Sequence, residues 1–304
     1  MSLRDGVMCW GREMRMVIAE RCTQVVRHHS EVGQWEAVSG EPHPCLRPYV
    51  TDYQGYTERV IGFARRLEVP SPNVTLIVNF GPLFRVIGVD GRMAAAAYGS
   101  MVAGLHDSAV LVEPTGPYDC LEVKLTPLGA RRFLGLPMNE LTNRTVDLGD
   151  VLGSTARRLI EQLYEMSEWE DRFSLLDATI ASRLAKERPS CSGVRQAWRM
   201  LSMSAGRQEI NALADELGWS HKHLIARFRE QVGLPPKTVA RILRFTHALR
   251  LLDRDGAIGW AEIAQVCGYY DQAHLIRDFR RLAGTTPGEF LRRRLPDGGG
   301  IVGD

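Results

Sequence analysis

Residues 262–292 read EIAQVCGYYDQAHLIRDFRRLAGTTPGEFLR, and residues 211–241 read NALADELGWSHKHLIARFREQVGLPPKTVAR. With one extra residue allowed in the turn of the later copy, a Leu-Ile pair, a Phe-Arg pair, two glycines, a proline and a final arginine fall at matching places. The two segments therefore form an internal repeat with a period of about 51 residues.

Each copy predicts a helix-turn-helix unit. A short helix ends at a glycine (Gly218 or Gly268), the residue that most readily adopts the left-handed conformation of a helix exit. A second helix then begins at a good capping residue, Ser220 or Asp271. Leucine and phenylalanine four residues apart form the inner stripe of this second helix, so its other side chains face outward.

The outward side chains of the second helices are suited to DNA. Arginine can bond guanine, glutamine can bond adenine, and small apolar groups can touch the thymine methyl. The predicted base-reading residues are His221, Lys222, Ile225 and Ala226 in the first copy and Gln272, Ala273, Ile276 and Arg277 in the second. The predicted phosphate contacts, which set register without reading sequence, are Ser220, Arg227, Arg229, His274, Arg280 and Arg281. For Ile225 and Ile276, a place in the core is an equally open alternative.

Charge is unevenly distributed along the chain. Residues 195–294 contain 17 Lys and Arg against 10 Asp and Glu, an excess of seven positive charges. Because the whole chain carries only +2, the remainder carries −5. A basic C-terminal third joined to an acidic remainder indicates that only the former meets a polyanion such as double-stranded DNA.

Residues 195–294 resemble the DNA-binding domain of the AraC/XylS family of bacterial transcription regulators. The resemblance lies in the Gly-aromatic turn, the His-Leu-x-Arg-x-Phe-Arg core and the Thr-Pro-x-x-Phe ending of the later copy. It implies seven helices, with two helix-turn-helix units joined by a long helix over residues 237–252, and two recognition helices in successive major grooves roughly 34 Å apart. It also implies promoter binding as a homodimer and, most commonly, activation through RNA polymerase. The first copy departs from the family pattern at Ala226, where many members have arginine.

The N-terminal part has a different residue pattern, dominated by short runs of β-forming residues. The expected fold class of the whole chain is therefore α+β. Residues 14–26 suggest one amphipathic helix, followed by a polar stretch through Gly40. From residue 42 to about 130, runs of β-forming residues alternate with Gly and Pro breakers, which predicts a small sheet or barrel. The runs are residues 74–80, 83–89, 109–113 and 121–126. In the resembling family this part is commonly a cupin-like β-barrel that binds an effector, or a dimerisation element.

Four regions are therefore expected. Residues 1–145 form the β-rich regulatory domain, 146–190 a helical linker, 191–295 the double helix-turn-helix domain and 296–304 a disordered tail. The helices over 151–186 have more apolar surface than a small barrel needs, which favours packing between the two subunits of a homodimer. Packing between the domains of one chain is the alternative.

The effector is the least determined feature. Along residues 120–125, alternation places Leu121, Val123 and Leu125 on one face of the strand. If that face lines a cavity, a mostly apolar organic effector is expected; if side chains fill the barrel, there is none. The candidate pocket residues are Trp35, Tyr98, His106 and Tyr118.

Several function classes find no support in the sequence. A cupin-type metal site needs more histidines than His43 and His106, and no nucleotide-binding or nucleophile motif occurs, so neither a metal, a cofactor nor catalysis is expected. A constitutive DNA binder without effector is the runner-up hypothesis. A DNA-alkylation-response enzyme ranks lower, because Cys9, Cys22 and Cys45 are too loosely spaced for a metal-bound cysteine. No apolar run is long enough to span a membrane and no secretory signal is visible, which predicts a cytoplasmic, nucleoid-associated protein.

Overall fold

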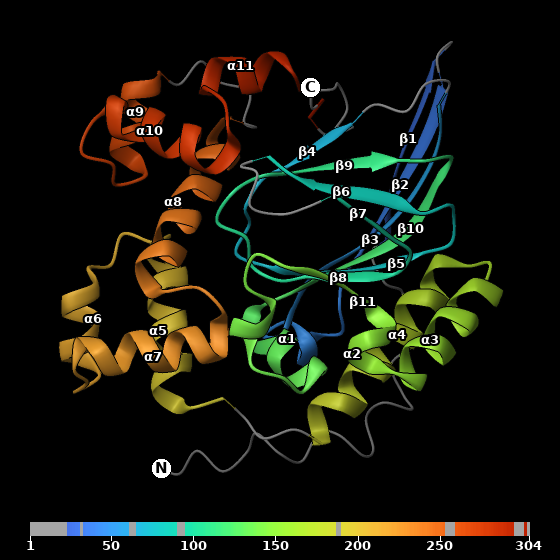
Figure 1. Cartoon of the computed structure of the whole chain (residues 1–304), viewed down its shortest axis with the longest axis horizontal. Helices are drawn as coiled ribbons and strands as arrows, with labels where there is room; N and C mark the ends of the chain where they lie inside the picture. The colour runs from blue at the N-terminus through green and yellow to red at the C-terminus, as the bar shows by residue number, and fades with distance from the viewer. Residues whose placement is uncertain are drawn as a thin grey trace.

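The computed structural model describes residues 23–30, 33–60, 65–89, 95–186, 190–252, 259–294 and 301–302. A β-rich N-terminal domain lies beside a helical C-terminal domain (Figure 1). The chain therefore has the α+β architecture that the sequence predicted.

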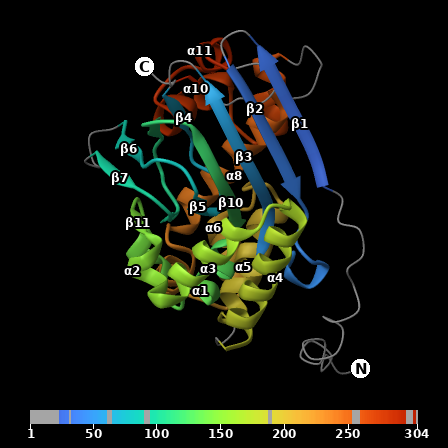
Figure 2. The same cartoon turned by 90° about the vertical axis from the view of Figure 1, so that its right-hand side faces the viewer.

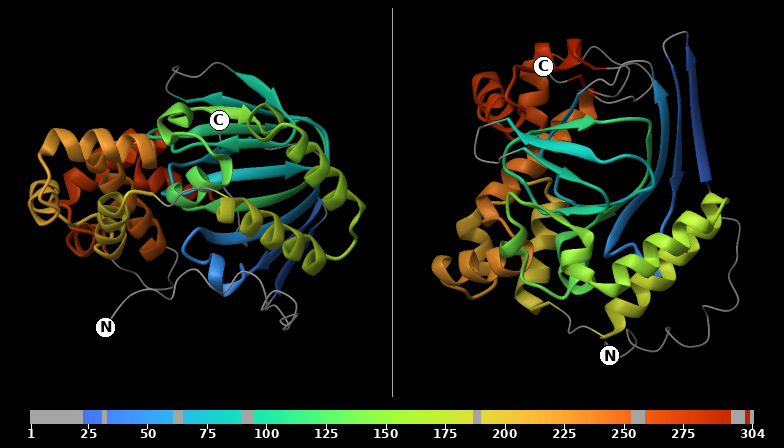
Figure 3. Two further views of the ribbon diagram at one scale, coloured as in Figure 1. Left: turned by 90° about the horizontal axis from the view of Figure 1, so that it is seen from below. Right: turned by 45° about the vertical axis from the view of Figure 1, so that its right-hand side comes forward.

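The N-terminal domain consists of two antiparallel sheets that lie face to face as a cupin-like barrel (Figure 3). Within the described residues, the larger sheet has the order β1 (Thr23–Ser30), β2 (Gly33–Gly40), β3 (Val50–Val60), β10 (Tyr118–Leu125), β5 (Val74–Asn79), β8 (Met101–Ala103) and β11 (Thr145–Asp147). The smaller sheet has the order β4 (Arg66–Glu68), β9 (Val110–Pro114), β6 (Phe84–Gly88) and β7 (Ala96–Tyr98). A 3-10 turn, η2 (Pro44–Leu46), connects β2 to β3.

The first hairpin corrects one prediction. Residues 23–26, expected at the end of a helix, lie in β1, and the expected polar stretch contains β2; residues 14–22 of the predicted helix lie outside the described part. Figure 2 shows β1, β2 and β3 side by side. Because β2 pairs with β3 over its whole length, from Gly33 opposite Val60 to Gly40 opposite Tyr53, pairing with a long neighbour overrides the weak local helical pattern.

Helices cover the outer face of the larger sheet. The segment after β10 forms α1 (Pro127–Leu134), the 3-10 turn η3 (Met138–Leu141), α2 (Leu148–Leu152), α3 (Ser154–Glu165) and α4 (Trp169–Lys186). The Phe173 ring of α4 stacks on Tyr53 of β3 at a centroid distance of 5.6 Å. Asp177, one turn further along, accepts a 2.8 Å hydrogen bond from the Tyr53 hydroxyl.

This packing accounts for the apolar face that suggested a dimer. The residues of α4 that face the sheet are buried within the same chain, namely Phe173, Leu176, Ile180, Ala181 and Leu184. The homodimer stays a prediction, but the observation from which it was drawn is explained by packing inside one subunit, which is the alternative stated above.

Within residues 190–252 and 259–294, the described part of the C-terminal domain, there are seven helices, as expected. They are α5 (Ser192–Met203), α6 (Ile210–Glu216), α7 (His221–Val232), α8 (Pro236–Leu252), α9 (Trp260–Val266), α10 (Gln272–Ala283) and α11 (Pro287–Arg292). The long connecting helix predicted over residues 237–252 is α8. One continuous apolar core runs from the larger sheet through α1 into α7 and α8, so the two domains share buried surface.

Two residues of the tail predicted to be disordered, Ile301 and Val302, are described by the structure and make hydrogen bonds with other parts of the chain. The amide of Leu67 in β4 donates to the carbonyl of Ile301 at 2.8 Å, and the amide of Val302 donates to the carbonyl of Arg293, just after α11, at 2.9 Å. Ile301 also packs against the main core. Residues 301–302 thus bridge the last helix of the DNA-binding domain to a barrel strand.

Gly55 provides a test of the packing between α4 and β3. An ideal Cβ at Gly55 would lie 2.4 Å from the Trp169 ring, closer than any real contact. We expect Gly55→Ala to lower the free energy of unfolding by about 1–3 kcal/mol, because the indole must move away from the sheet. Urea unfolding followed by Trp fluorescence measures this change.

Gly99→Ala is the matched control, since its Cβ would meet only a side-chain carbon at the ordinary distance of 3.6 Å. Equal stability of Gly55→Ala and the wild type would show that α4 does not press on the sheet as described.

Candidate DNA-binding surface and ligand cavity

The two helix-turn-helix units, α6–α7 and α9–α10, have the same backbone geometry at the turn. Gly218 and Gly268 adopt φ of 63° and 75°, the left-handed region that glycine enters without strain. The residue after each glycine donates its amide to a helix carbonyl at 2.9 Å, Trp219 to Ala214 and Tyr269 to Ala264. The sequence repeat is therefore a structural repeat.

Side chains repeat as well. The Trp219 ring meets His223 edge-on at 4.7 Å, and the Tyr269 ring meets His274 edge-on at 5.2 Å. These equivalent pairs identify Tyr270 as the extra residue of the second unit. Tyr270 is 94% exposed at the start of α10. Sequence reasoning missed it as a functional candidate, although the insertion of an aromatic residue into a turn was a visible signal.

Capping residues fix where each recognition helix begins. The Ser220 hydroxyl accepts from the His223 amide at 3.2 Å, and an Asp271 carboxylate oxygen accepts from the His274 amide at 2.7 Å. Each cap satisfies one amide that the helix itself leaves without a partner. Ser220, predicted as a phosphate contact, thus has a structural role in the chain as it stands.

The Leu and Phe stripe of each recognition helix is fully buried, and most of the predicted DNA contacts are exposed. The exposed residues among the predicted DNA contacts are Ser220, His221, Lys222, Ala226, Arg229, Gln272, Ala273, Arg277, Arg280 and Arg281. The partly buried ones are Ile225, Arg227, His274 and Ile276. Arg227 also forms an ion pair with Glu230 at 2.7 Å, so phosphate would have to compete for it.

Helix α10 is anchored on α8 by an ion pair and a ring contact. Arg241 of α8 lies 3.3 Å from the carboxylate of Asp278, and Phe245 meets Phe279 edge-on at 4.8 Å. Burial raises the pKa of Asp278, and the neighbouring Arg241 partly opposes that rise. Arg277 and Arg281 of α10 are both exposed.

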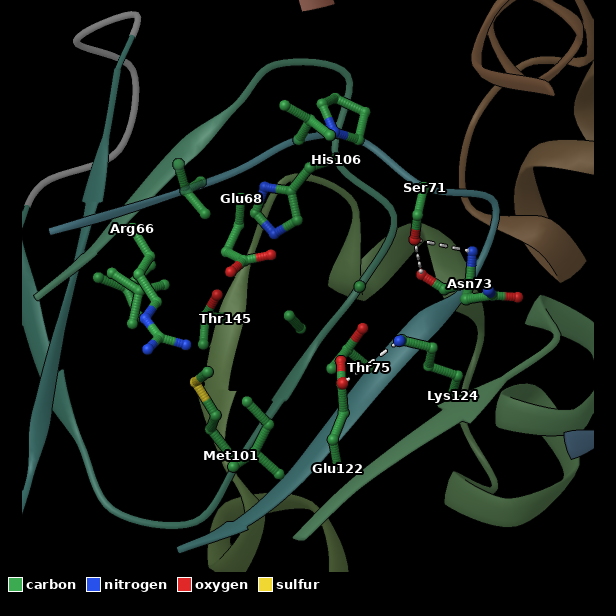
Figure 4. Close-up of a pocket in the computed structure, with 18 of the residues that line it drawn as sticks. Arg66, Glu68, Ser71, Asn73, Thr75, Met101, His106, Glu122, Lys124 and Thr145 are labelled. Carbon is green, nitrogen blue, oxygen red and sulfur yellow. Dashed lines mark hydrogen bonds and ion pairs between the residues drawn. The ribbon is translucent and has the colours of Figure 1, made fainter. Parts of the chain in front are cut away.

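The barrel interior contains a cavity of about 430 Å³, within the range of small-molecule sites. Both sheets contribute to its wall, and polar and charged side chains point toward its centre (Figure 4). On β10, Cys120, Glu122 and Lys124 line the cavity, whereas Leu121, Val123 and Leu125 are buried in the main core. The condition stated for a mostly apolar effector, that the apolar face of this strand lines the cavity, is therefore not met, because α1 and the helices outside the sheet pack on that face.

Two charged networks occupy the cavity wall. Arg66 contacts Glu58 and donates to the Tyr56 hydroxyl at 2.7 Å. Lys124 lies 3.4 Å from Glu122 and 3.8 Å from Asp52. Burial is the main cause that raises the pKa of Tyr56 to about 12. These networks make the interior polar, in contrast to the mostly apolar ligand that the sequence suggested.

Of the four pocket candidates, His106 and Tyr118 line the cavity. Trp35 instead stacks between His28 and Tyr56 at 5.7 and 6.1 Å, and the Tyr98 hydroxyl donates to the carbonyl of Thr145 at 3.0 Å. Sequence reasoning missed Arg66 and Glu68, which lie on a strand of only three residues, too short to give a recognisable period.

Both recognition helices end against the N-terminal domain. A Cβ at Gly233, the end of α7, would lie 3.2 Å from the carbonyl oxygen of Met138, and the Thr142 hydroxyl donates to the carbonyl of Gly233 at 2.8 Å. A Cβ at Gly284, the matching residue of α10, would lie 3.3 Å from Val89. The barrel therefore contacts both units at equivalent positions.

The described parts of the chain have neither a cluster of metal ligands nor a membrane-spanning helix. No group of three or more His, Cys, Asp or Glu side chains is placed to hold a metal ion. No helix there is both long and apolar enough to cross a membrane.

Comparisons with known proteins also identify a helix-turn-helix domain at the C-terminus. Residues 213–293 match a helix-turn-helix domain family, and residues 39–147 match a domain of unknown function, DUF6597. The HTH-type transcriptional regulator GlxA of Rhizobium meliloti (strain 1021) is 38% identical over 82 residues, 27% of this chain and 25% of GlxA. The HTH-type transcriptional activator RhaR of Yersinia pseudotuberculosis (serotype O:3, strain YPIII) is 30% identical over 153 residues, 45% of this chain and 52% of RhaR. The matches thus span a quarter to about half of these relatives.

Among solved structures, ToxT of Vibrio cholerae superposes with a TM-score of 0.47 at 10% identity, covering 79% of this chain and 98% of ToxT. The C-terminal domain of AraT, a response regulator from Geobacillus stearothermophilus, superposes with a TM-score of 0.33 at 21% identity, covering 36% of this chain and 92% of that domain. The sequence matches to regulators and the duplicated unit on one connecting helix agree: the C-terminal domain is a double helix-turn-helix domain of the AraC/XylS type.

Proposed function

We propose that the chain is a transcription regulator that inserts α7 and α10 into successive major grooves of promoter DNA and responds to a small molecule bound in the barrel. The observation that carries the DNA-binding part is the duplicated recognition helix, with the same glycine turn, aromatic-His contact and cap in both units. Such a pair on one chain fits two short DNA boxes about one helical turn apart.

The second unit is the better equipped for reading bases. Gln272 and Arg277 are exposed on the outward face of α10 and match adenine and guanine respectively. The first unit offers His221 and Lys222 near its start, with Ala226 where an arginine would reach a base. We propose that sequence discrimination is greater in the box bound by α10.

The barrel cavity supports an effector over a constitutive binder, because an interior filled by side chains would leave no such space. A route from cavity to DNA is also present. Strand β4, which places Arg66 and Glu68 in the cavity wall, is hydrogen-bonded to Ile301, whose neighbour Val302 bonds the residue after α11. We propose that ligand-induced shifts of β4 are transmitted to the second unit along this bridge.

The regulatory outcome and assembly are further parts of the proposal. RhaR is named a transcriptional activator, and we propose activation through contacts with RNA polymerase for this chain as well. Promoter binding as a homodimer stays part of the proposal. The DNA-alkylation-response alternative gains nothing from the structure, since Cys9 and Cys22 lie outside the described residues.

Two arginines of α10 separate base reading from phosphate binding. We expect Arg277→Ala to lose about 1–3 kcal/mol of binding and to relax the preference at one base pair. Arg281→Ala should weaken binding on all sequences alike and reduce the slope of log K against log salt by roughly one unit. Both side chains are exposed, so the fold should be unaffected.

The measurement is fluorescence anisotropy with the preferred DNA and its single-base variants, over a series of salt concentrations. If Arg277→Ala and Arg281→Ala lose affinity equally on every variant DNA, the assignment of Arg277 to base reading is wrong.

Tyr270 is expected to contact DNA from the start of α10. Because its ring is almost fully exposed, Tyr270→Ala should leave the melting temperature unchanged. Loss of an apolar contact to a base or sugar should weaken DNA binding by about 1 kcal/mol, which is roughly fivefold. Tyr164→Ala, an exposed tyrosine of α3 in the other domain, is the matched control. Equal affinities of the two variants would contradict a DNA contact by Tyr270.

A further inference from the structure

Glu68 is set apart from the other charged residues of the cavity. It shares one face of β4 with Arg66, while Leu67 between them is buried in the main core. Figure 4 shows its carboxylate directed toward the middle of the cavity, in the same region as His106. Much of the Glu68 side chain is accessible to solvent, because it projects into the open cavity.

The cations of the cavity wall are already engaged by other carboxylates. Arg66 is held by Glu58, and Lys124 lies between Glu122 and Asp52. Counting Glu68, four carboxylates stand against two cations in this described part of the barrel, an excess of two formal negative charges.

The Glu68 carboxylate makes no hydrogen bond or ion pair with any residue that the structure describes. Burial is the main cause that raises its pKa, and the like charge of Glu122 adds to the rise, although Arg66 and Lys124 oppose it. A carboxylate that faces a like charge in a cavity and has no counter-charge is less stable than one that is paired with a cation. Unfavourable arrangements of this kind are characteristic of binding sites, where a ligand supplies the missing interaction.

The remaining side chains of the cavity wall determine which polarity and size the uncharged part of a ligand can have. Five apolar side chains from β5, β6, β8 and β9, strands of both sheets, line the cavity and belong to one apolar cluster. They are Ile77, Val86, Met101, Val110 and Val112. Hydrogen-bonding groups lie on other parts of the wall, including Gln54, Asn73 and Thr75. A ligand that fits has one charged end and a compact apolar or weakly polar body.

We infer that the barrel cavity binds a small organic cation, an amine or amidine, whose charged group pairs with Glu68 while its body lies against the apolar wall. The inference rests on the proposed function only in making this ligand the effector. The cation supplies a positive charge and hydrogen-bond donors for the Glu68 carboxylate, which has no such partner among the described residues. A carboxylate ligand would meet the excess negative charge, since both cations are engaged.

The full-length chain can be tested with size-matched probes. Benzamidine and phenethylamine are the cations, benzyl alcohol the neutral probe and benzoate the anion. We expect only the cations to raise the melting temperature, by an amount that grows with probe concentration as binding to the native state requires. Calorimetry should give dissociation constants for the cations at least about tenfold weaker in Glu68→Gln than in the wild type.

Two further variants keep the test decisive. Without probe, Glu68→Gln should melt above the wild type, because the amide removes the like-charge repulsion between Glu68 and Glu122. Glu68→Asp should retain a weakened cation response, because it keeps the charge on a shorter side chain. Glu41→Gln, an exposed residue paired with Arg47, should match the wild type in both respects.

A cation response that survives in Glu68→Gln, or a response to benzoate alone, would overturn the inference. DNA binding is measured separately on the same samples. Loss of cation binding in Glu68→Gln with DNA binding retained supports the site. Absence of DNA binding by the wild type, with the cation response intact, would contradict the proposed function while leaving the cation site standing.

Discussion

The geometry of the DNA-binding surface depends on one backbone constraint, the left-handed turn at Gly218 and Gly268. These residues let α6 and α9 end abruptly, so that α7 and α10 leave at the angle that exposes their starts. Any Cβ would strain the turn, and at Gly268 it would also lie 2.8 Å from the Arg207 side chain. Given this turn, the buried Leu and Phe of each recognition helix orient the opposite face toward solvent.

The two faces of the larger sheet of the barrel differ: the outer face packs against helices, and the inner face lines the cavity. On the outer face, the rings of α4 lie so close to β2 and β3 that only glycine fits at residues 40 and 55. That face takes the apolar side chains of β10, which leaves its charged side chains for the interior. This arrangement explains why the interior is polar. It also explains why the apolar face of α4 is buried against the sheet and not left exposed for a second subunit. Strand β4 of the smaller sheet, which lines the cavity, is hydrogen-bonded to Ile301.

The sequence predicted the helical domain better than the barrel, for physical reasons. In the helix-turn-helix units every signal is local: a turn glycine, a cap and residues four apart recur in both copies, so the units and the connecting helix were predicted. The hairpin formed by β1 and β2 depends on pairing with β3. Which face of β10 points inward depends on which side of the sheet the helices cover. Neither is encoded in alternation alone, because alternation gives two faces without saying which is inside. Of the four candidate pocket residues, only His106 and Tyr118 line the cavity.

The central claim, that one chain reads two DNA boxes, is tested most directly by selection from a random-sequence DNA pool with the full-length chain at physiological salt, followed by sequencing. The account predicts enrichment of two short boxes whose centres are about 10 base pairs, or one helical turn, apart, with stronger conservation in one of them. Enrichment of a single box, or retention of DNA without any shared sequence, would contradict it.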